Sequence, residues 1–125
     1  PAALRAFELG ALRAAGLSPR LDACARCGRP PPAEERARFD PGQGGILCEP
    51  CAPYAAPGAP SLSAAAAAAL ARLSDGGLAR AGSEPLAPPA GREARDALTA
   101  FVEHHLGRRL QARRFLDEVG PLLGD

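Results

Sequence analysis

Apolar residues recur at helical spacing in three parts of this sequence. The first covers residues 2–15, where the spacing predicts a helix with one buried stripe, ended by Gly16. The residues of that stripe are Leu4, Phe7, Leu9, Ala11 and Leu12. The second part is an alanine-rich run that begins after Ser61 or Ser63 and ends near Gly76. Alanine has the highest helix propensity and serine is a preferred N-cap, so this run is also predicted to be a helix.

The third helical pattern is the most strongly amphipathic. It follows residues 76–90, a Pro- and Gly-rich stretch that is expected to be a surface loop. Gly107 stands where the C-terminal cap of this helix is expected. One face of the predicted helix carries Ala94, Leu98, Phe101, Val102, His105 and Leu106. A final short helix is expected to dock on the same core through Leu110, Phe115, Leu116 and Val119.

The segment between the first two predicted helices has a different pattern. Pro and Gly interrupt regular structure, and two short apolar runs, at residues 37–39 and 46–47, lie on either side of a Gly-rich turn. These runs predict a small β-hairpin. The chain is therefore predicted to be mainly α, with four or five helices and this hairpin inserted, and residues 1–125 are expected to form a single domain.

Charge and hydropathy exclude several classes of protein. The 125 residues carry a net charge of +1, which gives no global attraction to nucleic acid or to an anionic membrane surface. The longest apolar run, residues 64–71, is much shorter than the roughly 20 residues that span a bilayer. The N-terminus has no basic region followed by an apolar stretch, so no secretory signal is predicted. No membrane partner is expected.

The four cysteines, Cys24, Cys27, Cys48 and Cys51, form two Cys-x-x-Cys pairs. Their spacing is typical of a four-thiolate Zn²⁺ site, in which each pair lies on a tight turn whose amides stabilise the thiolates. Four protein ligands leave no open position on the ion, so a structural role is predicted, with residues 22–54 as a zinc-binding insertion. A redox dithiol, two disulfides and an iron–sulfur cluster are the alternatives.

The sequence pairs no nucleophile with a plausible base. His104 and His105 are adjacent, and adjacent helical side chains point about 100° apart, so the two are not expected to face one ion. His105 is expected to be partly buried and His104 to lie at the surface. Because every cysteine is assigned to the metal, the chain is predicted not to be an enzyme.

Arginine is concentrated near the end of the chain. A phosphate-contacting patch is expected there, with salt-dependent binding that does not read base sequence. Its members are Arg108, Arg109, Arg113 and Arg114. In the structural alternative, the same side chains interact with the last carbonyls of a helix or form ion pairs. The acidic residues available for such pairs are Glu103, Asp117 and Glu118.

Three stretches of this sequence resemble the C-terminal region of the RecO family of bacterial recombination mediators. They are RAFELGALRAAGLSPRLDACARCG, which leads to the first cysteine pair, GGILCEPC at the second pair, and FVEHHLGRRLQARRFL near the end. The resemblance implies a helical domain with an inserted zinc motif, which in this family follows an N-terminal OB-fold. The chain is expected to start where that helical domain starts.

The resemblance also implies a noncatalytic role in DNA repair and homologous recombination in the bacterial cytoplasm, at the nucleoid. The expected partners are single- and double-stranded DNA, RecR and the acidic C-terminal tail of the single-stranded-DNA-binding protein. That tail is expected to dock on Leu110, Phe115 and Leu116. The expected activities are strand annealing and support of RecA loading, with weak DNA binding in the absence of the OB-fold. A zinc-ribbon protein-interaction adaptor without a DNA role is the alternative.

Overall fold

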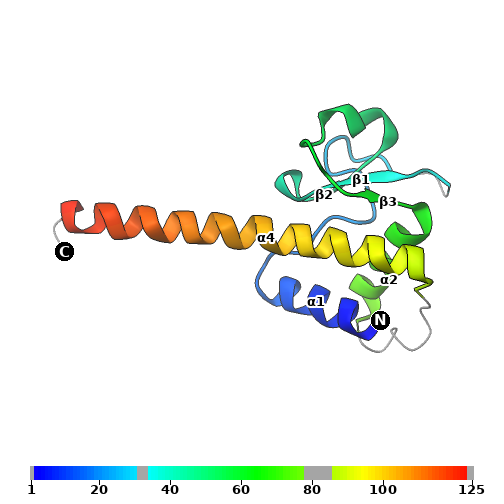
Figure 1. Ribbon diagram of the computed structural model, residues 1–125, viewed down its shortest axis with the longest axis horizontal. Helices are drawn as coiled ribbons and strands as arrows, with labels where there is room; N and C mark the ends of the chain where they lie inside the picture. The colour runs from blue at the N-terminus through cyan, green and yellow to red at the C-terminus, as the bar shows by residue number, and fades with distance from the viewer. Residues whose placement is uncertain (1, 31–33, 78–85, 124–125) are drawn as a thin grey trace.

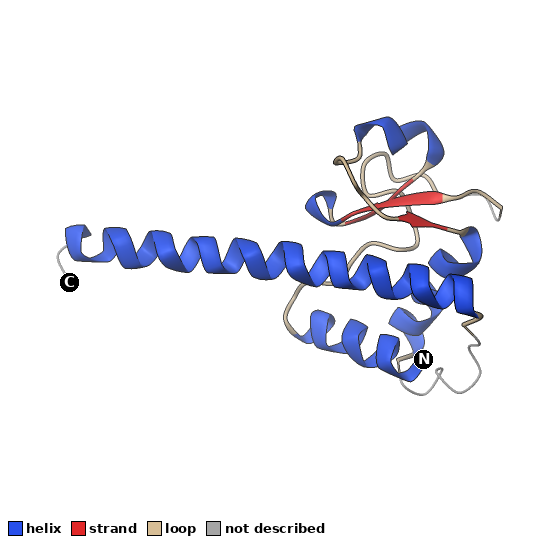
Figure 2. Cartoon of the chain, in the orientation of Figure 1, coloured by secondary structure: helices blue, strands red, loops and turns tan. Residues whose placement is uncertain are grey.

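The computed structural model describes residues 2–30, 34–77 and 86–123, and it is mainly helical with a small sheet beside a long helix (Figure 1; Figure 2). The α-helices in these ranges are α1 (Ala2–Ala14), α2 (Ala64–Gly76) and α4 (Pro88–Val119). The strands are β1 (Ala37–Asp40), β2 (Gly45–Leu47) and β3 (Ser61–Leu62). Short 3-10 helices are η1 (Pro41–Gln43), η2 (Glu49–Tyr54) and η3 (Gly120–Leu123). The predicted fold class is confirmed.

Local sequence signals set the ends of α1 and α2 where they were expected. Gly16 adopts a left-handed conformation with φ 76°, and the N–H of Leu17 donates to the carbonyl of Leu12 at 2.8 Å, which closes α1. At the start of α2, Ser63 is the N-cap, since its Oγ accepts a hydrogen bond of 3.1 Å from the N–H of Ala66. The other candidate, Ser61, lies in β3.

The predicted hairpin is present as part of a three-stranded antiparallel sheet with strand order β2-β1-β3. Phe39 of β1 lies opposite Ile46 of β2, and Ala37 lies opposite Leu62 of β3. The third strand is only two residues long and was not predicted, because a pair of residues carries no recognisable alternation. The sheet brings the two cysteine pairs to the same part of the molecule.

One hydrophobic core joins the sheet to the helices. Phe39 of the sheet contacts Phe101 of α4 with ring centroids 5.8 Å apart, and both side chains are buried. The sheet lies on one side of α4 and α1 on the other, and α2 crosses α4 from the side of β3 to the side of α1 (Figure 1). The core also contains Leu9, Leu12, Ile46, Leu62, Ala66, Leu70, Leu73, Ala94, Ala97 and Leu98.

The buried stripe of α1 differs from the predicted one. Leu9 and Leu12 are buried as predicted. The other three members of the predicted stripe are exposed: Leu4, Phe7 and Ala11. These three are themselves spaced by three and four residues, so they form a second apolar stripe, and it points away from the core. Periodicity alone does not tell which of two such stripes is covered.

The predicted helix end at Gly107 is wrong. α4 continues without interruption to Val119, so the expected final short helix is its last part. Gly107 keeps an ordinary negative φ, because the neighbouring Arg, Leu, Gln and Ala residues have high helix propensity and outweigh the cost of about 1 kcal/mol for one interior glycine. Within the loop expected at 76–90, residues 78–85 lie outside the described residues, and Pro88 already begins α4.

The part of α4 that follows His105 extends beyond the rest of the chain (Figure 1). The expected docking of this part on the core is therefore wrong. Its large apolar side chains are about half to two thirds exposed, and they are Leu106, Leu110, Phe115 and Leu116. Val102 is also exposed, at 39%. The core-forming part of α4 ends at Phe101, and the projecting part of α4, residues 106–119, lies beyond it.

The division of α4 into a core-forming part and a projecting part predicts that the same Leu→Ala change has different effects on the free energy of unfolding in the two parts. Leu98→Ala is expected to lower the free energy of unfolding by about 3 kcal/mol, because the Leu98 side chain is fully buried. Leu110→Ala is expected to change it by less than about 0.5 kcal/mol, because Leu110 is exposed and alanine favours the helix. Urea denaturation followed by circular dichroism measures both. Equal losses would contradict this division of α4.

Candidate metal centre

The first cysteine pair lies on a tight turn between α1 and β1. The N–H of Gly28 donates to the carbonyl of Cys24 at 2.9 Å, and Gly28 has φ 81°, which favours glycine. The amides of Arg26 and Cys27 point at the Sγ of Cys24, at 3.4 and 3.5 Å. The turn is tied to the sheet by the N–H of Ala25, which donates to the carbonyl of Ile46 at 2.7 Å. This geometry stabilises a thiolate on Cys24.

The second pair lies where β2 passes into η2. Cys48 is the N-cap residue of η2, and the N–H of Cys51 donates to its carbonyl at 3.0 Å. Leu47, the residue before the pair, is fully buried between the two cysteine turns and packs with three of the cysteines. The sheet therefore fixes the second pair directly, since its first cysteine follows the last residue of β2.

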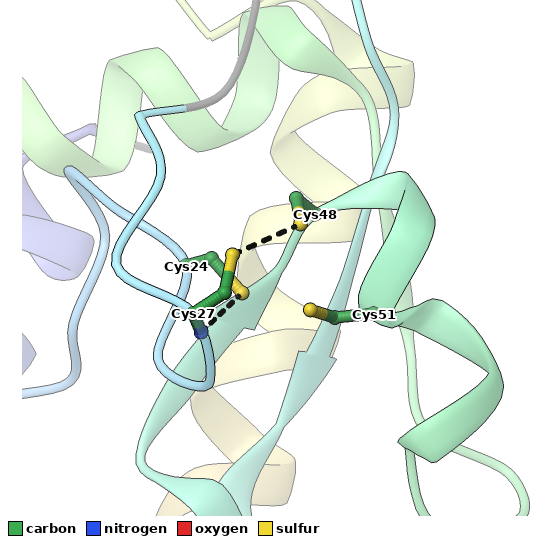
Figure 3. A group of neighbouring side chains, drawn as sticks. All are labelled: Cys24, Cys27, Cys48 and Cys51. Carbon is green, nitrogen blue, oxygen red and sulfur yellow. Dashed lines mark hydrogen bonds between the residues drawn. The ribbon is translucent and has the colours of Figure 1, made fainter.

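The four thiols converge on one point (Figure 3). Their Sγ atoms all lie within 4.8 Å of one another, and the Sγ atoms of Cys27 and Cys48 are 3.6 Å apart. A tetrahedral ion with metal–sulfur bonds of about 2.3 Å requires sulfur–sulfur separations of about 3.8 Å, so the arrangement fits one metal ion. Cys24, Cys48 and Cys51 are buried, and Cys27 is exposed. The four predicted ligand residues are brought together.

The protein environment shifts the pKa values of the Cys24 and Cys51 thiols in opposite directions. Burial opposes ionisation of Cys24, but the backbone amides of Cys27, Cys48 and Arg26 lower the pKa of this thiol to about 6. Burial and the neighbouring thiols of Cys48 and Cys24 raise the pKa of Cys51 to about 12. The Cys24 thiol therefore loses its proton easily, whereas the Cys51 thiol needs a bound cation to become a thiolate.

Two arginines lie against the thiol cluster. The guanidinium of Arg26 stacks on the ring of Tyr54, 3.5 Å from its centroid, and its Nη1 is 4.0 Å from the Sγ of Cys51. Arg29 is held by Glu35, with Nη2 at 3.0 and 3.1 Å from the two carboxylate oxygens. The thiol of Cys48 and the carboxylate of Glu35 together raise the pKa of Arg29. These cations offset the negative charge of a tetrathiolate site.

Asp40 is a buried acidic residue at the end of β1, next to the hairpin turn. It is 4% exposed and accepts hydrogen bonds of 2.9 Å from the N–H of Gly42, the side chain of Gln43 and the N–H of Ala56. Burial by itself raises its pKa, but these donors, led by Ala56, lower it overall. The sequence analysis did not single out Asp40, although Asp before Pro-Gly is a common turn signal. Asp40 thereby ties the hairpin turn to the segment that follows η2.

The four arginines of the predicted patch lie on the projecting part of α4 and are exposed. Arg109 and Arg113 are one turn apart on one face, and Arg108 and Arg114 lie to either side. In the described part of the chain none of the four forms an ion pair or hydrogen bond, so the alternative of pairing with neighbouring acidic residues is not observed.

The three predicted partner-binding residues do not share one face. Leu110 and Phe115 are five residues apart, which places them about 140° apart around the helix, and Leu116 lies on a third side. All three are exposed. A groove that includes all three therefore needs surfaces from a second element.

The two histidines lie where α4 passes the hairpin turn. The ring of His105 stacks near that of Phe101, with centroids 4.3 Å apart, and the ring of His104 lies close to Gly42 of η1. Both histidines are half-buried. The prediction that His105 is partly buried is therefore confirmed, and the prediction that His104 lies at the surface is wrong. The hairpin turn covers His104, a contact between segments that helical periodicity does not reveal.

A mainly helical protein with a small sheet and a cluster of four cysteines defines the class, and sequence comparison gives the family. Residues 1–114 match the family described as "Recombination protein O C terminal". The chain belongs to this family. It is 74% identical over 124 residues to "DNA repair protein RecO" of Anaeromyxobacter sp. (strain K), covering 99% of this chain and 48% of that protein.

More distant relatives carry the same name. Identity is 44% over 120 residues to the protein of Myxococcus xanthus (strain DK1622), covering 96% of this chain and 46% of the relative. It is 35% over 118 residues to that of Moorella thermoacetica, covering 93% and 43%. The chain thus spans about half the length of these relatives. No solved structure matches it. In the described ranges no helix is both long and apolar enough to cross a bilayer.

Proposed function

We propose that this chain is a noncatalytic DNA-repair module that contacts the DNA backbone through the projecting part of α4. The observation that carries the proposal is the group of four exposed arginines on a helix that extends beyond the core, in a chain of the RecO C-terminal family. Guanidinium groups without ion-pair partners are available to phosphate oxygens. Such contacts give affinity and orientation without reading bases. This role would place the protein at DNA in the cytoplasm.

The metal in this proposal is a single structural Zn²⁺ held by the four cysteines. Four thiolates favour zinc over harder cations, and a site with four protein ligands leaves no position for a reacting water. The thiol cluster packs with Leu47 and two partly buried alanines, which is too little apolar surface to hold the two cysteine turns together by itself, whereas Phe39 and Ile46 join the strands to the main core. The ion would therefore stabilise the cysteine turns of residues 22–54, the proposed insertion.

Replacing Arg108, Arg109, Arg113 and Arg114 with glutamine is expected to weaken binding to single- and double-stranded DNA similarly for all sequences. The logarithm of the affinity falls with the logarithm of the salt concentration, and each lost phosphate contact makes this slope less steep by about 0.7 to 0.9. Four lost contacts therefore make it less steep by about 3. Fluorescence anisotropy over a range of salt concentrations measures affinity and slope. Glutamine removes the charge and has a helix propensity close to that of arginine, so the fold is preserved.

The matched control replaces two exposed arginines outside α4 with glutamine: Arg13 in the last turn of α1, and Arg20 in the segment that follows α1. These changes alter net charge but leave α4 intact, so the salt slope is expected to stay near the unchanged value. Equal slopes in the unchanged chain and the quadruple variant would overturn the role of α4. No salt-dependent DNA binding at all would favour the alternative, a zinc-ribbon adaptor that binds only proteins.

The same part of α4 is proposed to take part in protein contacts. Leu110, Phe115 and Leu116 present apolar surface beside the arginines, which suits an acidic tail with an apolar end such as that of the single-stranded-DNA-binding protein. Because these three side chains point to different sides of the helix, the docking surface would be completed by a second element. RecR binding, strand annealing and support of RecA loading are proposed for the whole protein, and membership of the family supports this proposal.

A further inference from the structure

A small arginine-lined pocket lies at the other end of α4, away from both the metal centre and the projecting arginines. Its volume is about 250 Å³, and none of the described residues that line it is acidic. The lining residues are Arg5, Leu86, Pro88, Gly91, Arg92 and Arg95. Three cations and two apolar side chains thus surround one concave surface.

Arg5 is the least expected member of this group. The residue is 5% exposed, and its Nη1 has no hydrogen-bond partner. Its Nε lies 3.0 Å from Oε1 of Glu8, but neither atom is aligned for a hydrogen bond. A buried guanidinium with unpaired donors is costly unless an anion completes it. Burial of this kind separates Arg5 from the ordinary exposed arginines of the chain.

The start of α4 adds to the positive potential at the same place. This 32-residue helix begins at Pro88, has no acidic residue in its first turn, and has no side-chain hydrogen bond at its N-cap residue Ala87. Its N-terminal partial positive charge is therefore uncompensated and lies at the pocket. Arg92 forms no hydrogen bond or ion pair in the described part of the chain. Arg95 makes only a 3.4 Å contact between its Nε and the exposed Asp96.

We infer that this pocket binds a terminal phosphate dianion, either free phosphate or a phosphate monoester such as the end of a nucleotide or of a DNA strand. Three guanidinium groups, one partly offset by Glu8, match a dianion better than a single carboxylate. An internal phosphodiester carries one charge and is flanked by nucleotides on both sides, so it does not reach a buried arginine. Leu86 and Pro88 provide an apolar wall for the carbon attached to the phosphate.

The first test uses inorganic phosphate on the metal-loaded chain at constant ionic strength, followed by NMR chemical shifts. Phosphate is expected to shift the amides at the start of α4, including Ala90, and the guanidinium signal of Arg5. The exposed pair Arg92→Gln and Arg95→Gln is expected to weaken this binding at least about tenfold. The control pair Arg13→Gln and Arg20→Gln is expected to leave it unchanged. Because Arg92 and Arg95 are exposed, this double variant tests phosphate binding at the pocket without any change to buried Arg5, whose substitution could prevent folding.

The second test distinguishes the sources of the phosphate. Stronger binding of an oligonucleotide with a 5′-phosphate than of one with a 5′-hydroxyl, lost in the Arg92→Gln and Arg95→Gln variant, supports the site at a DNA end. Equal binding of the two oligonucleotides together with specific phosphate binding supports the site for free phosphate or a nucleotide. The phosphate test does not depend on DNA binding by the projecting part of α4. Failure of the phosphate site can therefore be distinguished from failure of the proposed DNA-backbone contact. Shifts spread over all exposed arginines, or binding of an acidic peptide that phosphate does not displace, would overturn the inference.

Discussion

Cys24→Ser is expected to abolish stoichiometric metal binding and to loosen the two cysteine turns. The Cys24 thiol has the lowered pKa in the cluster, because two backbone amides point at its Sγ. A serine hydroxyl in the same place would not replace this thiolate as a zinc ligand. Structural zinc sites supply about 10 to 16 kcal/mol of apparent binding free energy in small zinc domains, which is as large as the whole stability of a typical domain. Metal analysis and near-ultraviolet circular dichroism measure the two losses.

The same loss of metal is expected for the other three cysteines, including Cys27, which is exposed. A purely hydrophobic role for the cluster would instead make the exposed Cys27→Ser change harmless. Ala56→Ser is the matched control, since it adds a hydroxyl at an exposed position in the same segment. Full metal retention after Cys24→Ser would refute the four-ligand site.

Gly45→Ala is expected to lower the free energy of unfolding by about 4 kcal/mol or more. The chain before the first cysteine pair runs parallel to β2, and the N–H of Ile46 donates to the carbonyl of Arg20 at 3.0 Å. A Cβ on Gly45 would overlap that carbonyl oxygen and lie 2.7 Å from the Arg20 nitrogen, so two backbone segments would have to separate. Chemical denaturation measures the change, and the metal centre is expected to loosen with it.

A second glycine provides the control for this substitution. Gly10 lies inside α1, and a Cβ there would meet nothing within 4 Å. Gly10→Ala is therefore expected to raise the free energy of unfolding by roughly 0.5 to 1 kcal/mol, because alanine favours the helix. Destabilisation by both changes to the same extent would show that the close approach of Gly45 to Arg20 has no special effect.

The cluster of four cysteines could be predicted from the sequence because its signal is local. Each Cys-x-x-Cys pair forms its own turn, and Gly28 marks the first turn in the sequence itself. The features that hold the two turns together were not predictable in the same way. One such feature is the bridge between Arg20 and Gly45, and another is the hydrogen bond that the N–H of Ala56 donates to Asp40. Both join residues that are far apart in the sequence. No spacing rule within one segment reports such contacts.

The errors in the helices have a related cause. Gly107 is a valid stop signal, but the residues on both sides favour a helix strongly enough to continue through it. Leu110 and Leu116 then lie beyond the region where α1, α2 and the sheet supply partners, so their apolar character does not lead to burial. Helical periodicity shows which residues share a face, and tertiary packing decides which faces are covered.

X-ray absorption at the zinc K-edge of the purified chain tests the central claim most directly, that one zinc ion bound by the four cysteines organises this domain. Four sulfur neighbours at about 2.3 Å are predicted, with one zinc per chain and no nitrogen or oxygen ligand. The same sample treated with a chelator should expose four reactive thiols. A chain that is folded and metal-free, or an ion with oxygen or nitrogen in its first shell, would contradict the account.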